Sequence, residues 1–239
     1  VATEMYSAGI DRLTHQPLSF SVSETTEGVH IHIIDAELMG KGEKEKKDLY
    51  IEGVQNNGII NHYEYIINSE GTIEIRHVLK PEGKMPLWFP RIGLTLTVSD
   101  ALDQVKWYGR GPQENYPDRK TGYPMGIYAS TVQAMYEPYL MPQDYGLRTD
   151  VRWLQLTTDK GIGLQFKMNE WFNFNIYPYS TDNLTKAMYT YQLQKQKGMT
   201  LNLDYATTGV GCTARGVFGA YKAMPQEYRR TISIRPMMK

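Results

Sequence analysis

The chain has 239 residues, with 26 lysines and arginines against 26 aspartates and glutamates, so its formal net charge is zero. A nucleic-acid partner is disfavoured because binding a polyanion needs a net basic face, and a membrane partner because no apolar run approaches the roughly 20 residues that cross a bilayer. The single Cys212 excludes an internal disulfide and a zinc site built on several thiolates.

Short stretches that alternate apolar and polar residues run through the chain and predict β-strands. The first lies at 29–33, and the next two, at 59–67 and 72–79, are joined by a predicted hairpin turn in which Gly71 can take positive φ. The charge run at 41–48 carries both signs and predicts a solvated loop. Further strands are predicted at 92–98, 105–108, 151–156, 162–168, 171–176, 199–204 and 228–234.

One helix is predicted, over residues 181–194, with Thr181 or Asp182 as its N-cap. Its buried face would carry Leu184, Met188 and Tyr191 or Gln192. About ten strands without strand–helix alternation exclude a doubly wound sheet and a (β/α)₈ barrel. The fold class that remains is all-β, a large antiparallel β-sandwich, and we expect residues 1–239 to form a single such domain.

Between the strands, residues 107–150 form a stretch rich in Gly, Pro and Tyr, where the alternation lapses. It contains Glu114 and Asp118 beside two arginines, and these two acids are a candidate carboxylate pair for glycoside hydrolysis. We interpret the four residues instead as an ion-pair and hydrogen-bond cluster that folds a loop of low apolar content. They are Arg110, Glu114, Asp118 and Arg119.

The sequence contains no nucleophile elbow, zinc-protease motif or phosphate loop. His30 and His32 share a strand face at i and i+2, which can aim two imidazoles at one metal ion. We interpret them as an ordinary polar sheet face, and we expect no metal and no other cofactor. The many Tyr and Trp side chains could stack on sugar rings, although most are expected to pack in the core or loops.

The stretch WYGRGPQENYPDRKTGYPMGIY at 107–128, followed by YEPYLMPQ at 136–143 and GLRTDVRW at 146–153, is too specific to be read as composition. It resembles the C-terminal small-chain domain of family two β-galactosidases. Further matching segments continue in the same order, so the resemblance covers essentially the whole chain. They lie at 6–12, 174–184, 201–204 and 209–211.

The resemblance implies a large sandwich, a supersandwich similar to galactose mutarotases, that packs beside a catalytic barrel carrying two glutamates. The chain opens on Val1 rather than Met. We therefore expect a non-catalytic C-terminal piece of a larger enzyme that hydrolyses terminal β-galactosides. Its implied partners are the barrel and the galactoside substrate, and its implied roles are to scaffold the barrel and to complete the sugar pocket.

Two departures from the family bear on the pocket. In the best-known members a Trp shortly after a Gly-x-Gly segment closes the pocket, whereas here 209–211 is followed by CTARGVFG, without a Trp. We expect the replacement contacts in this loop, with Arg215 as the polar contact, Phe218 as the stacking residue and Cys212 beside them. Tyr189 stands where members commonly have His, so another β-glycoside remains open as substrate.

Two alternatives come from other functional classes. The first is a stand-alone aldose epimerase, which needs an acid and a base on one sheet face, and His62, His77 and Glu64 are the available groups. The second is a carbohydrate-binding module with an exposed row of aromatic side chains. The resemblance also suggests a bacterial protein that takes part in polysaccharide degradation, located in either the cytoplasm or the periplasm.

The family's domain usually begins before the segment matched at 6–12, so the first strands of the sandwich are expected to be missing. An open sheet edge exposes unpaired backbone groups and apolar surface. The expected remedies are a second copy of the chain, giving a homo-oligomer, or coverage of the edge by the loop at 41–48.

Overall fold

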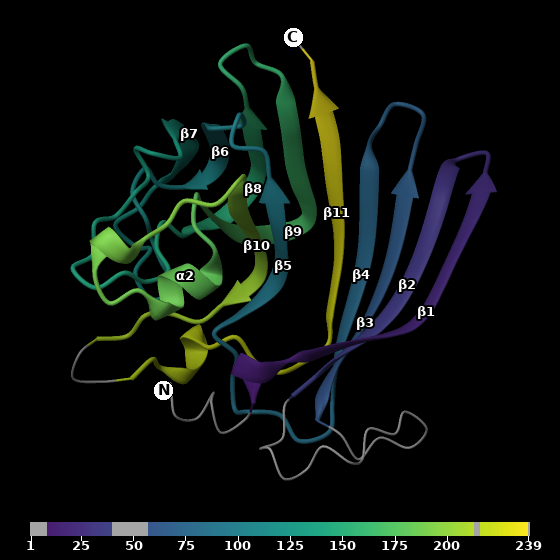
Figure 1. Cartoon of the computed structure of the whole chain (residues 1–239), viewed down its shortest axis with the longest axis horizontal. Helices are drawn as coiled ribbons and strands as arrows, with labels where there is room; N and C mark the ends of the chain where they lie inside the picture. Colours follow the sequence, from purple (N-terminus) through teal and green to yellow (C-terminus); the bar gives the residue numbers. More distant parts are fainter. Residues whose placement is uncertain (1–8, 40–56, 213–215, 239) are drawn as a thin grey trace.

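The computed structural model describes residues 9–39, 57–212 and 216–238. Within them lie eleven β-strands, each antiparallel to the strands with which it pairs, so the all-β antiparallel prediction is confirmed (Figure 1). The strands are β1 (Thr14–Thr25), β2 (Gly28–Leu38), β3 (Gly58–Ile67), β4 (Ile73–Glu82), β5 (Arg91–Val98), β6 (Gln104–Arg110), β7 (Met125–Thr131), β8 (Arg148–Thr157), β9 (Gly163–Tyr177), β10 (Met199–Thr207) and β11 (Tyr228–Met237).

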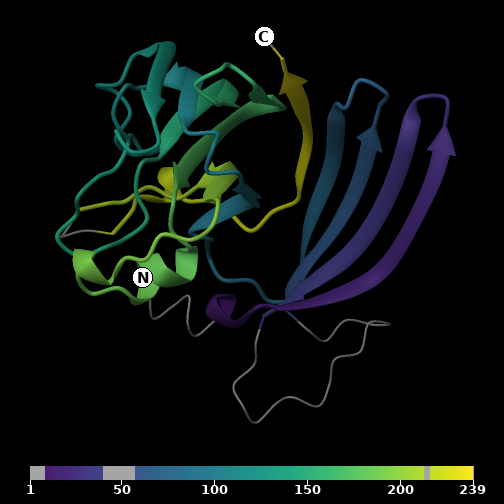
Figure 2. The ribbon, with the colours of Figure 1, turned by 45° about the horizontal axis from the view of Figure 1, so that its top comes forward.

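Strand β9 is the point at which the sheet forks. Its first half pairs with β11, which continues through β4, β3 and β2 to β1, whereas its second half pairs with β10 and then β5. On its other side β9 pairs with β8, followed by β6 and β7. Figures 1 and 2 show β1 to β4 as a fan on one side of β11 and the remaining strands on the other.

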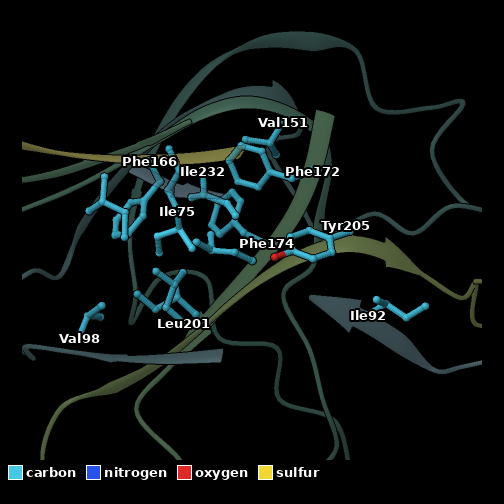
Figure 3. Packing of buried hydrophobic residues seen from close by; sticks show 14 of the residues in the cluster. Ile75, Ile92, Val98, Val151, Phe166, Phe172, Phe174, Leu201, Tyr205 and Ile232 are labelled. Atoms are coloured by element: carbon cyan, nitrogen blue, oxygen red, sulfur yellow. The ribbon is translucent and has the colours of Figure 1, made fainter. Parts of the chain in front are cut away.

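The fork gives the sheet two arms: one runs from β11 through β4, β3 and β2 to β1, and the other is formed by the second half of β9 with β10 and β5. The hydrophobic core lies between these two arms. Alternate residues of β9 and β10 point into it, including Phe172, Phe174 and Leu201, all of which are almost completely buried. They meet Ile75 from β4 and Ile232 from β11 in the same cluster (Figure 3). Burial of such apolar side chains contributes roughly 1.5 to 3 kcal/mol each, so this layer holds the arms together.

The predicted hairpin between β3 and β4 is confirmed. The side-chain oxygen of Asn68 accepts hydrogen bonds from the backbone N–H groups of Glu70 and Thr72, both at 3.0 Å. Gly71 has a φ of 77°, a conformation that glycine adopts without a steric penalty. The turn residues therefore set the register of the two strands.

The predicted helix over 181–194 is wrong beyond its first turns. The α-helix α2 (Thr181–Lys186) is capped by the Ser180 side chain, and a separate 3₁₀ turn, η2 (Thr190–Gln192), follows. The side chain of Gln192 accepts hydrogen bonds from the N–H groups of Met188 and Tyr189, which a continuing helix would have bonded to its own carbonyls. As predicted, Leu184 is buried, but Met188 and Tyr191 are exposed. The remaining short turns are η1 (Ile10–Arg12) and η3 (Gly219–Tyr221).

Strands β1 and β7 form two edges of the sheet, and neither was predicted. Most of β1 is exposed, including the apolar side chains of Phe20 at 69% and Val22 at 54%. The loop at 41–48 that was expected to cover such an edge lies outside the described residues. No helix in the described part of the chain is long and apolar enough to cross a membrane.

Candidate functional site

A groove of about 690 Å³ lies where the start of β5 meets three loops. Two tyrosines line it together with charged and amide side chains, a mixture typical of sites for small polar ligands. Its described lining residues are Pro90, Arg91, Tyr116, Arg119, Tyr139, Gln143, Asp144, Thr181, Thr207, Thr208, Val210, Gly211 and Cys212.

The groove borders a row of polar side chains on the outer face of the β9–β10–β5 arm. On β10, Asn202 alternates with the core leucines, so its side chain points away from the core. Its amide group donates to the Asn175 side-chain oxygen at 2.8 Å, and its own oxygen accepts from the Thr95 hydroxyl at 2.8 Å. The buried Asn175 and Asn202 side chains and the exposed Thr95 hydroxyl are thus hydrogen-bonded to one another across three strands.

Arg91 links this row to the groove. Its Nη2 lies 3.0 Å from Asp204 Oδ2, 3.4 Å from Asp144 Oδ2 and 3.3 Å from Asn175 Oδ1. Burial raises the pKa of Asp204 to about 6, although Arg91 opposes that shift. The Asp144 side chain is 47% exposed, so it presents a carboxylate to the groove while Asp204 remains inside the protein.

Glu114 orients the two tyrosines of the groove. Its carboxylate accepts hydrogen bonds from the Tyr116 hydroxyl at 3.0 Å and from the Tyr139 hydroxyl. It also accepts from the backbone N–H of Gly146 at 2.8 Å. Burial and the adjacent Glu114 raise the pKa of Tyr139 to about 12, so this hydroxyl keeps its proton and donates. One carboxylate thus joins both aromatic walls to the loop that precedes β8.

Asp118 holds the loop at the other rim. Its two carboxylate oxygens accept from the N–H groups of Val210 and Gly211, at 3.0 and 2.7 Å. A Cβ atom at Gly209 would lie 2.4 Å from the Asp118 carboxyl carbon, so only glycine allows this close approach. The Gly-x-Gly segment is therefore fixed by a side chain from the 107–128 stretch.

The predicted ion-pair cluster is wrong, because its four members do not pair with one another. They are Arg110, Glu114, Asp118 and Arg119. Glu114 contacts the loop that precedes β8, and Asp118 contacts the Gly-x-Gly segment. Arg110 pairs with Asp150 at 2.5 Å, and Arg119 donates to the Gly211 carbonyl at 3.4 Å. The four residues do fold the loop as expected, but through separate contacts that tie it to neighbouring segments.

The three sugar contacts predicted from the resemblance are placed differently. Cys212 is exposed and lines the groove. Phe218 is 66% exposed at the start of η3 and is not among the residues of the groove wall. Arg215 lies outside the described residues.

The acid and base groups considered for an epimerase lie on two different faces of the sheet. His77 is buried and hydrogen-bonded to Tyr205 and Asn61. It pairs with Tyr63 across β3 and β4, so His62 and Glu64, one residue to either side of Tyr63, point to the opposite face of the sheet. His77 therefore cannot act on one substrate together with His62 or Glu64, which share the other face.

Sequence reasoning missed Arg91, Asp144 and Asp204. An indication was present in the alternation of Asn202 and Asp204 with leucines on a buried strand, because polar side chains at such positions need partners. The pattern could not name Arg91 as the partner, since β5 and β10 are far apart in the sequence.

Comparisons with known proteins agree on one family. A family model described as "Beta galactosidase small chain" matches residues 6–234. The chain is 38% identical over 147 residues to a β-galactosidase of Priestia megaterium, covering 62% of this chain and 14% of that protein. It is 31% identical over 207 residues to a β-galactosidase of Vibrio cholerae, covering 86% of this chain and 18% of that protein. The chain thus spans less than a fifth of these relatives.

Among solved structures, an aldose epimerase homologue from C. elegans is similar with a TM-score of 0.44 and 12% sequence identity. The similarity covers 92% of this chain and 69% of that one.

Proposed function

The chain belongs to the β-galactosidase small-chain family, and from this premise we propose that it is a non-catalytic domain that completes the sugar pocket of a β-galactosidase. The observation that carries the proposal is the groove walled by Tyr116 and Tyr139 and bordered by the Arg91–Asp144 pair. Aromatic faces match the apolar face of a pyranose, and a paired carboxylate and guanidinium offer both acceptors and donors to its hydroxyl groups.

The same groove favours binding over cleavage. A retaining glycosidase needs two carboxyl groups about 5 to 5.5 Å apart across the sugar. Among the described residues that line the groove, Asp144 is the one carboxylate, and Asp204 is too deeply buried to reach a ligand there. The two catalytic glutamates are therefore assigned to a partner, the catalytic barrel of the parent enzyme.

The remaining assignments follow from this role. We assign residues 1–239 to one sandwich domain, and the segment from Gly209 to Phe218 to the edge of the pocket. In it Cys212 lines the groove, and we assign the polar contact to Arg215 and, outside the groove wall, a stacking contact to the exposed Phe218. A terminal β-galactoside is the substrate class of the parent enzyme.

The test is a chimera in which this chain replaces the small-chain domain of the Priestia megaterium relative. Turnover of a chromogenic galactoside is expected for the chimera and not for the isolated chain. Changing Asp144→Asn in the chimera should raise KM roughly tenfold with little change in kcat, because a contact made equally in ground and transition states is lost. Asp182→Asn, an exposed change on α2, is the matched control. Turnover by the isolated chain above a no-protein blank would overturn the proposal.

A further inference from the structure

Two histidines and a glutamate converge on the arm of the sheet that lies away from the groove. His30 and His32 project from the same face of β2, with their rings stacked and their centroids 6.5 Å apart. Glu64 on β3 lies directly opposite His32 in the strand register. One potential ligand atom from each residue lies within 4.8 Å of the others.

The glutamate is already oriented for such a role. Its Oε2 accepts from Arg76 Nη1 at 3.1 Å, and its Oε1 is directed to His30, 3.6 Å from Nδ1. Arg76 is itself held by Glu74, with 2.8 Å between Nε and Oε1, which offsets part of its positive charge. Hydrogen-bonded outer partners of this kind fix the orientation of ligating carboxylates in metal sites.

The histidines are free to coordinate. The Nε2 atom of His30 is buried and has no hydrogen-bond partner among the described residues, and the 3.6 Å from Nδ1 to Glu64 is longer than a hydrogen bond. A buried ring nitrogen without a partner is costly, so an ion at this position would gain a ligand without breaking a hydrogen bond of His30. His32 is exposed and leaves a path for the ion and a water molecule.

From these observations we propose that His30, His32 and Glu64 form a binding site for a divalent transition-metal ion of the Zn²⁺ class, with water as the fourth ligand. Two imidazoles and one carboxylate are a ligand set that suits Zn²⁺, whereas Mg²⁺ and Ca²⁺ prefer oxygen ligands throughout. Ligand bonds of about 2.0 to 2.2 Å require the three side chains to draw closer together. Side-chain rotation achieves this, because the two paired strands fix the backbone positions.

The site is independent of the sugar groove. None of the described residues that line the groove comes from β2 or β3, and the face that carries His30, His32 and Glu64 is opposite to the one that carries Tyr63 and the buried His77. Metal binding and sugar binding are therefore expected to be separable by mutation.

Equilibrium dialysis of the 239-residue chain against ZnCl₂ tests the proposal. We expect one Zn²⁺ per chain and a rise in Tm on binding. The changes His32→Ala and Glu64→Gln should each lower the affinity at least tenfold and remove the rise in Tm. Since His32 is exposed, its loss leaves the fold intact, which the Tm without metal verifies.

The matched control is His15→Ala. His15 also lies beside two carboxylates, 3.4 Å from Asp35 and 3.2 Å from Glu37, but it pairs across from Glu37 on the other face of the arm. This variant should bind Zn²⁺ as the parent chain does. No binding by the parent chain, equal binding by His32→Ala, or loss of binding in His15→Ala would each overturn the proposal.

Discussion

Replacing Asp204 by asparagine should remove a pH dependence from the stability of this protein. Asp204 is 1% exposed, and burial raises its pKa to about 6 although Arg91 Nη2 lies 3.0 Å from its Oδ2. The unfolded carboxyl group titrates near 3.9. Because the folded value is the higher one, the stability that Asp204 contributes is complete below about pH 4 and is lost as the pH rises through about 6. Two pKa units at 1.36 kcal/mol each give a loss of about 3 kcal/mol.

Urea unfolding of the parent chain and of Asp204→Asn, at several values from about pH 4 to 7, measures this loss. Subtracting the two curves isolates Asp204 from other titrating groups. We expect the variant to gain roughly 2 to 3 kcal/mol relative to the parent over this range.

The control variant is Asp150→Asn. Burial alone would raise the pKa of Asp150, but hydrogen bonds from Arg110 and Lys120 outweigh it and hold that pKa below its usual range. Its contribution is therefore complete above about pH 4 and is lost only at lower pH, so the difference between the parent chain and Asp150→Asn should be flat from about pH 4 to 7. If the Asp204 difference were as flat as that of Asp150, the argument that burial outweighs the ion pair with Arg91 would be refuted.

Three further changes test other parts of the structure. Burial, followed by the charge of His62, lowers the pKa of His77 to about 4. As the pH falls from about 7 to 4, the parent chain should therefore lose about 3 kcal/mol of unfolding free energy relative to His77→Gln, as measured by urea unfolding. Parallel stability curves for the two proteins would contradict this prediction. Glu114→Ala leaves two tyrosine hydroxyls and the Gly146 N–H without their acceptor and should cost roughly 3 kcal/mol, so an unchanged urea midpoint would contradict the contacts described. Asp118→Ala breaks bonds to two backbone N–H groups that water can replace, and should cost about 1 to 2 kcal/mol by thermal unfolding, whereas a loss above about 4 kcal/mol would indicate a buried charged partner.

Much of the fold is predictable from alternation alone, because a strand with one face in a core must alternate apolar and polar residues. The stretches at 59–67 and 72–79 became β3 and β4, with the turn between them as expected. Strand β1 was missed although Phe20 and Val22 alternate with serines. Most of the strand is exposed on both faces, so it lacks the buried apolar residues that mark most of the other strands. The helix at 181–194 was predicted too long, because the Gln192 side chain accepts hydrogen bonds from the backbone N–H groups that would extend the helix.

The groove was less predictable than the strands. Glu114 was singled out by sequence, but two of its partners, Tyr139 and Gly146, come from the loop that precedes β8. Arg91 meets Asp204 only because β5 pairs with β10. His30 and His32 were correctly placed on one face. The third member, Glu64, depends on the register between β2 and β3, which alternation within one strand cannot give.

The position of β11 has a consequence for how the molecule assembles over time. β11 follows the other ten strands along the chain, yet it is the strand that joins β4 to β9. Until residues 228–237 are synthesised, the hydrogen-bonding edge of β4 has no partner on that side, and its core residue Ile75 lacks Ile232 opposite it. Contacts so distant in sequence form slowly, and an unpaired apolar edge is a template for pairing with other chains. The nascent protein therefore passes through an interval in which aggregation competes with closure, and chaperones that shield strand edges should raise its yield.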